Sequence, residues 1–131
     1  MIGSDLFRQG GTVFNEILQG IVQQTGGGIG AVLMGYDGIA IEQHLEPIEG
    51  FDFQLLAVEY ANVLKEIKKT VEILDTGRME EVSIKTERFF VIIRSLTDEY
   101  FLALTLDRTG NFGKGRYLMM RDAPKLLEAL M

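Results

Sequence analysis

The chain has 131 residues, a net charge of −6, 47% hydrophobic residues and no cysteine. This length favours one domain with its own hydrophobic core. The lack of cysteine excludes disulfides, thiol catalysis and cysteine-ligated zinc, and by default it favours a cytoplasmic location. The negative charge and the lack of a clustered basic stretch argue against binding to nucleic acid phosphates.

Neither a membrane span, a secretory signal nor a metal site is expected. Apolar runs such as IGAVLMGY are far shorter than the roughly 20 residues that a membrane helix needs. The first residues lack the basic and apolar regions of a secretory signal. His44 is the only histidine and is interpreted as a solvated strand residue, so no metal and no cofactor are predicted.

The first predicted helix begins near Thr12, which is a plausible N-cap, and ends at Gly26. Its apolar residues recur at the spacing of one buried helical face: Val13, Phe14, Ile17, Leu18, Ile21 and Val22. The domain is therefore expected to cover residues 12–131, after an N-terminal segment at residues 1–11.

Two strands should follow this helix. Residues 29–36 are apolar on both faces, as expected of a central strand. Asp37-Gly38 predicts a type I′ hairpin turn. Residues 39–42 then alternate in polarity and predict a half-exposed strand.

The longest periodic segment is a helix that starts near Phe53 and is closed by Gly77. Three strands follow near residues 82–87, 89–96 and 100–106, with short turns at residues 87–88 and 97–99. A last helix starts near Arg116, and Pro124 should kink it or begin a second segment. The order α-β-β-α-β-β-β-α predicts an α+β domain with a five-stranded antiparallel sheet.

The long helix has more apolar surface than one sheet can cover. One stripe is expected to face the sheet: Phe53, Leu56, Tyr60, Val63, Ile67, Val71 and Leu74. Ala57, Ala61 and Leu64 then point elsewhere, with Lys68 below them. Two alanines four residues apart would let a second backbone approach, although they could also be simple helix formers. The surplus favours a second subunit.

The segment EVSIKTE is a candidate edge strand, whose alternating residues are Val82, Ile84 and Thr86. An unpaired edge invites strand addition from a second copy. The helix and this strand together predict a homodimer in which each meets its symmetry mate.

Two glycine-rich stretches are candidate phosphate sites. TGGGIGA lies after a helix and before a strand, so a helix C-terminus of negative partial charge would face the phosphate, and a helix cap is the better interpretation. GNFGKG has the order strand, loop, helix but does not match a P-loop, so a tight turn and an anion site both stay open. No catalytic constellation is found, and no enzyme activity is predicted.

Two longer motifs resemble the Roadblock/dynein light chain domain family. AVLMGYDGIAIEQ (residues 31–43) is similar to the family's hairpin, and RTGNFGKGRYLMM (residues 108–120) is similar to its closing motif. The similarity extends over nearly the whole chain from about residue 12, and it is to the bacterial MglB-like branch of the family.

The resemblance implies a homodimer with a continuous sheet and two long helices side by side. It implies that this helical face receives a small Ras-like GTPase of the MglA-like kind. The candidate residues carried over are Ala57, Ala61, Leu64, Lys65 and Lys68.

The implied function is activation of GTP hydrolysis, in cell polarity and motility, by reshaping the partner's own catalytic residues. Arg78, Arg94 and Arg116 are formal arginine-finger candidates. Two alternatives stay open: a non-activating dimeric scaffold or adaptor for a GTPase or motor complex, and a small-ligand sensor that uses the glycine-rich loops.

Overall fold

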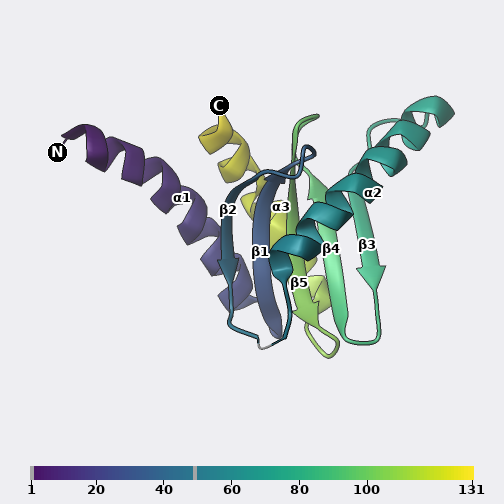
Figure 1. Cartoon of the computed structure of the whole chain (residues 1–131), viewed down its shortest axis with the longest axis horizontal. Helices are drawn as coiled ribbons and strands as arrows, with labels where there is room; N and C mark the ends of the chain where they lie inside the picture. Colours follow the sequence, from purple (N-terminus) through teal and green to yellow (C-terminus); the bar gives the residue numbers. More distant parts are fainter. Residues whose placement is uncertain (1, 49) are drawn as a thin grey trace.

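The structure is a computed structural model that describes the backbone of residues 2–48 and 50–131, and the side chains of residues 13–48 and 50–131. Three helices and five strands follow in the predicted order (Figure 1). Their bounds are α1 Ile2–Gln24, β1 Gly28–Gly35, β2 Ala40–Leu45, α2 Phe53–Leu74, β3 Glu81–Lys85, β4 Phe89–Ser95, β5 Tyr100–Asp107 and α3 Phe112–Leu130.

The five strands form one antiparallel sheet in the order β2-β1-β5-β4-β3. The predicted α+β class, sheet and element order are therefore confirmed. The central strands β1 and β5 pair from Gly28 with Leu106 to Gly35 with Tyr100. Both are buried on their two faces, which explains why their sequences are apolar almost throughout. The edges are β2 on one side and β3 on the other.

The sheet separates two cores because successive side chains of a strand point to opposite faces. On one face, Ala31, Leu33 and Ile92 pack with α1 and α3. On the other face, Val32, Met34 and Ile93 pack with α2. Figure 1 shows α2 crossing the sheet obliquely on the near side, with α3 behind it. The molecule thus has three layers, and α2 is the only helix of the described chain on its face.

The start and end of α2 are set by two aspartates. The side chain of Asp52 accepts a hydrogen bond from the Leu55 amide at 3.0 Å, as an N-cap does. The helix ends at Leu74 and is followed by Asp75 in the left-handed conformation, with φ of 53°. The helix was expected to be closed by Gly77, but Asp75 closes it two residues earlier, because an aspartate can occupy this conformation in place of glycine.

Two expectations for α1 and α3 are wrong. The α1 helix runs from Ile2, so Thr12 lies inside it and does not cap its start. The cost of glycine in a helix is only about 1 kcal/mol, so Gly10-Gly11 weakens but does not end the helix. The α3 helix starts at Phe112, before the predicted Arg116, and continues as one helix through Pro124.

The β1–β2 hairpin is confirmed, but its turn is not type I′. That type needs positive φ at both central residues, whereas only Gly38 has it, with φ of 87°. The Gly38 amide donates to the Gly35 carbonyl, and the register shifts between Leu33 and Met34. The central residues of this turn are therefore Tyr36 and Asp37, and the left-handed Gly38 follows them; the register shift comes from a separate bulge at Ile41 of the edge strand.

The two glycine-rich stretches lie against each other. Gly27 has φ of 81°, and a Cβ atom there would lie 2.6 Å from the Cα of Gly110. The amide of Asn111 donates to the Gly26 carbonyl at 2.6 Å, and that of Asp107 donates to the Gly27 carbonyl. These glycines therefore allow the α1–β1 connection to approach the β5–α3 loop closely.

We expect Gly27→Ala to lower the free energy of unfolding by about 2 kcal/mol or more, because it adds both a left-handed strain and a backbone clash. The matched control is Gly113→Ala, an exposed helix position whose added Cβ meets only Asn111 Oδ1 at 3.9 Å. The control should gain about 0.5–1 kcal/mol. Urea unfolding measures both, and equal effects would contradict the packing described.

Candidate functional site: the outer face of α2 and the β3 edge

The face of α2 that was predicted to receive a partner lies against the protein's own sheet. Ala57, Ala61 and Leu64 are each 1% exposed and pack with sheet residues of the α2 core. The expected orientation of the helix is therefore wrong, since these three side chains are covered. Of the two predicted lysines, Lys65 is exposed and Lys68 is half-buried.

Lys68 fastens α2 to the end of the sheet. Its Nζ donates to the Asp98 carbonyl at 2.7 Å and lies 3.8 Å from the Asp98 carboxylate. The same ammonium lies 4.7 Å from the centre of the Tyr36 ring, which is within the range of a cation–π contact. These contacts give Lys68 a role inside the protomer.

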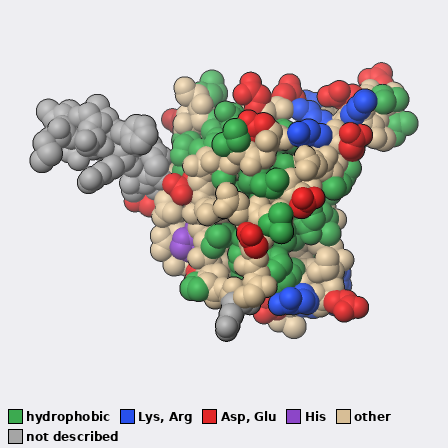
Figure 2. Space-filling model, in the orientation of Figure 1, with side chains coloured by type: hydrophobic (Ala, Val, Ile, Leu, Met, Phe, Trp, Pro, Cys, Tyr) green, Lys and Arg blue, Asp and Glu red, His purple; other side chains and the backbone are tan. Residues whose placement is uncertain are grey.

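The apolar stripe that was expected to cover the sheet lies at the flank of that contact instead, apart from Phe53 at its start, which is buried. Its members Leu56, Tyr60, Ile67 and Val71 are half-buried, and Tyr60 packs on the α2 core. Val63 is 51% exposed and Leu74 is 64% exposed. Figure 2, which views the molecule from the α2 side, shows hydrophobic side chains at the surface of this face, between charged groups. We call the following residues the outer stripe: Leu56, Tyr60, Val63, Ile67, Val71 and Leu74.

The difference between the expected and the observed orientation of α2 has a simple packing reason. Alanine side chains are short, so Ala57 and Ala61 let the helix backbone come close to the sheet, while Leu64 fills the space beyond them. Both stripes of α2 are apolar with helical spacing, so periodicity alone does not choose between them. The size of the side chains, small in one stripe and large in the other, was the signal that could have found the right face.

The β3 strand forms an open edge next to the outer stripe. It pairs only with β4, so its other side carries no strand in the described chain. Val82 and Ile84 are half-buried and pack on the α2 core together with Tyr60. Thr86 lies beyond the strand, where its hydroxyl accepts from the amides of the hairpin turn to β4. The outer stripe and the β3 edge thus meet at the α2 core, through Tyr60, Val82 and Ile84.

A buried tyrosine lies beneath this surface. Tyr36 is 7% exposed, and its hydroxyl donates to the Ser95 hydroxyl at 2.9 Å. Burial raises the pKa of Tyr36 above its ordinary value; the bond with Ser95 opposes this shift, and the nearby Asp98 charge adds to it. The phenol is therefore held neutral.

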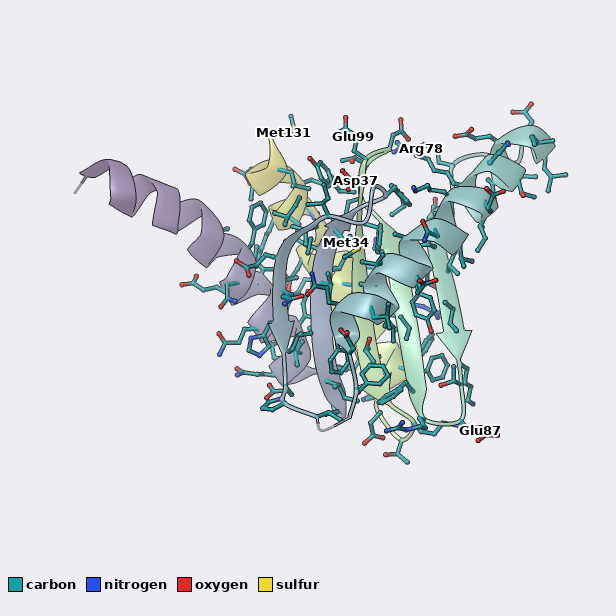
Figure 3. The ribbon with its side chains drawn as sticks, viewed as in Figure 1. Met34, Asp37, Arg78, Glu87, Glu99 and Met131 are labelled. Atoms are coloured by element: carbon teal, nitrogen blue, oxygen red, sulfur yellow. The ribbon has the colours of Figure 1, made fainter. Side chains whose placement is uncertain are left out.

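The three candidate arginine fingers have different surroundings. Arg116 donates to Glu81 with two nitrogens at 2.9 Å and stacks on Phe112, so it is engaged within the protomer. Arg94 is half-buried on the α3 side of the sheet. Arg78 is exposed, and Figure 3 shows it at the end of the sheet that also carries Asp37 and Glu99.

The N-terminus of α3 is already capped. The side chain of Asn111 accepts from the Lys114 amide at 3.1 Å, in the position an anion would take. Hydrogen bonds from Thr109 hold the pKa of Asp107 below its ordinary value. This loop is therefore organised by its own side chains, which favours the tight-turn interpretation of GNFGKG.

Two findings limit the chemistry of the described residues. They contain no cluster of histidine and carboxylate side chains that could hold a metal ion. Within that same part of the chain, none of the helices combines the length and apolarity needed to cross a membrane.

Substitutions on α2 distinguish its inner face from its outer one. Ala61→Arg places a long cation between α2 and the sheet, so we expect the free energy of unfolding to fall by about 3 kcal/mol or more. Asn62→Arg, at the exposed neighbouring position, should change it by less than about 0.5 kcal/mol. Chemical denaturation followed by circular dichroism compares them, and a stable Ala61→Arg variant would contradict the assignment.

The buried phenol of Tyr36 should make stability depend on pH. A raised pKa of Tyr36 in the folded state means that its stabilising effect is complete below about pH 10 and is lost as the pH rises through the folded value. Tyr36→Phe should lose about 1 kcal/mol at neutral pH, because it lacks the bond to Ser95. Above about pH 10 the difference should shrink. A constant difference across this range, measured by denaturant unfolding, would refute the assignment.

Comparison with known proteins identifies the fold. The profile of the Roadblock/LC7 domain family matches residues 14–106. A solved structure of MglC from Myxococcus xanthus is 36% identical with a TM-score of 0.65, and the match covers 88% of this chain and 98% of that one. The gliding protein MglB from Thermus thermophilus is 19% identical with a TM-score of 0.81, covering 92% of this chain and 90% of that one.

A third structure, MglB with a tetrameric arrangement, is 21% identical with a TM-score of 0.77 and covers 87% of this chain and 85% of its own. No curated protein matches the sequence. The two MglB structures support the fold alone, whereas the family profile and the 36% identity with MglC show a relationship in sequence as well. The chain belongs to the Roadblock/LC7 domain family.

Proposed function

We propose that this protein is a homodimeric regulator of a small Ras-like GTPase, and that two copies join through the outer stripe and the β3 edge. One observation carries the proposal: Tyr60 of the outer stripe packs on the same core as Val82 and Ile84 of the unpaired edge strand β3, and Val63 and Leu74 of that stripe are exposed. Membership of the Roadblock/LC7 family supports a GTPase-related regulator in general.

The outer stripe and the β3 edge both leave groups uncovered that a second copy of the chain would cover. Val63 and Leu74 expose more than half of their surface, and burying apolar area contributes about 25 cal/mol per Å². The free edge of β3 offers backbone donors and acceptors that a second β3 would satisfy. A two-fold axis between the edges would bring each stripe to its copy, because a two-fold interface uses the same patch twice.

The GTPase would then bind the paired helices. Activation would act through the partner's own catalytic groups, which binding to the paired helices would rearrange. Of the three arginine-finger candidates, Arg78 is the exposed one, so its removal tests this mechanism most directly.

A second candidate is a dimeric scaffold or adaptor that binds a GTPase or a motor complex without activating it. The identity with MglC is 36%, whereas that with the two MglB structures is 21% and 19%. Similarity to MglB at this level supports the fold alone and does not favour activation over passive binding. The two candidates differ in the rate of GTP hydrolysis that a bound GTPase would show.

The dimer is tested by light scattering after size exclusion. The wild type should have twice the mass of the 14.7 kDa chain. Val63→Asp, which places a charge in the outer stripe, should shift it to the monomer mass. The matched control is Val13→Asp on α1, where the valine is 41% exposed, and it should stay dimeric. A wild type that is monomeric at high concentration would refute the dimer.

The GTPase role is tested with a purified small Ras-like GTPase of the MglA-like kind. A regulator should form a complex, and an activator should raise phosphate release at least about tenfold. Arg78→Ala should lower that rate by less than about tenfold, whereas loss of a true arginine finger costs about 10³-fold or more. Binding with an unchanged rate would select the scaffold, and absence of a complex would contradict both.

A further inference from the structure

A pocket on the far side of the sheet from α2 combines cations with an apolar wall. It has a volume of about 220 Å³ and lies between α3, the end of β4 and the connection from α2 to β3. Arg78, Glu80 and Arg94 bring charges to it, and Leu96, Ala123 and Leu127 line it with apolar surface. Neither the fold nor the proposed dimer explains this combination.

Arg94 lacks the counter-charge that its position would suggest. It pairs with Leu102 on the sheet face that α3 covers, and its neighbour across β3 is Glu81. The Glu81 carboxylate, however, accepts from Arg116 at 2.9 Å through both of its oxygens. Arg94 forms no ion pair within the described residues, although its side chain is half-buried.

Arg78 adds a second cation at the mouth of the same pocket. It follows α2 in the connection to β3, and it too forms no ion pair with the described part of the chain. Glu80 is exposed and bonds to neither arginine. The lining therefore keeps a net positive charge in a chain whose total charge is −6.

We propose that this pocket binds a small organic carboxylate, with its head between Arg78 and Arg94 and its apolar part against Leu96, Ala123 and Leu127. Guanidinium groups present paired N–H donors that match the two oxygens of a carboxylate. A protein cavity of about 150 Å³ is large enough for benzene. A volume of about 220 Å³ thus suits a molecule of the size of benzoate.

A ligand bound there would tie three elements together. Its carboxylate would bind Arg78 of the α2–β3 connection and Arg94 of β4, and its apolar part would pack on α3. That connection leads directly into the edge strand β3. The site nevertheless belongs to one protomer, so binding does not depend on the proposed dimer or on a GTPase.

The experiment is a titration followed by two-dimensional amide NMR, with benzoate as the probe and benzyl alcohol as its uncharged analogue. Benzoate should shift the amides of residues 78–80, 94–96 and 123–127 in a saturable way, at millimolar affinity. Benzyl alcohol should bind at least about tenfold more weakly, because it cannot pair with the guanidinium groups. Raising the salt concentration should weaken benzoate binding.

Variants separate the charged head from the apolar wall. Arg94→Gln and Arg78→Gln should each weaken benzoate binding at least about tenfold. Ala123→Leu should block benzoate binding, because the larger side chain fills the apolar part of the pocket while both arginines stay in place. Arg108→Gln is the matched control, since Arg108 is exposed and contacts the Glu87 carbonyl elsewhere. Unchanged thermal midpoints would show that the variants fold.

Three results would overturn the proposal. The first is the absence of saturable shifts at these residues in the wild type. The second is equal affinity for benzoate and benzyl alcohol, which would remove the role of the arginines. The third is an affinity that Arg94→Gln and Ala123→Leu leave unchanged in folded protein.

Discussion

The close packing of α2 on the sheet determines which surface this protein offers to other molecules. Ala57 and Ala61 are small enough to let the helix backbone approach the strands, and Leu64 completes the contact. Once these three are covered, the outer stripe lies about a quarter turn round the helix from them, so it flanks the sheet contact: Val63 and Leu74 are exposed, and its other four side chains are half-buried. The exposure of Val63 and Leu74 is therefore a consequence of how the core is filled. The sheet adds the second half of this surface, because the order of the strands leaves β3 at an edge. Lys68 holds the helix to the far end of the sheet, so the outer stripe is carried on a fixed support.

The sequence predicted the architecture well because its signals are local. Alternation and turn residues located the strands, the short hairpins predicted an antiparallel sheet, and an apolar run marked β1 as a central strand. It failed where a choice depended on tertiary packing. Both stripes of α2 have helical spacing, and only contact with the sheet reveals that the alanine stripe is the inner one. The same holds for Asp75, which ends α2 by its backbone conformation without help from Gly77.

The glycines and charges were also beyond prediction from single motifs. Gly27 and Gly110 are far apart in sequence, and only the structure shows that both are needed for the close contact between the α1–β1 connection and the β5–α3 loop. Arg94 has an acidic neighbour in Glu81, but Arg116 from α3 occupies that carboxylate, which no local pattern indicates. The cationic pocket therefore arises from three separate segments of the chain.

The proposed dimer depends on a second copy covering the outer stripe and the β3 edge. Hydrogen–deuterium exchange of the β3 amides, measured over a range of protein concentrations, tests this most directly. Amides pointing away from β4 should be protected at high concentration and exchange faster on dilution, as pairing with a second β3 is lost. Fast exchange of these amides at every concentration, as at a free edge, would contradict the dimer.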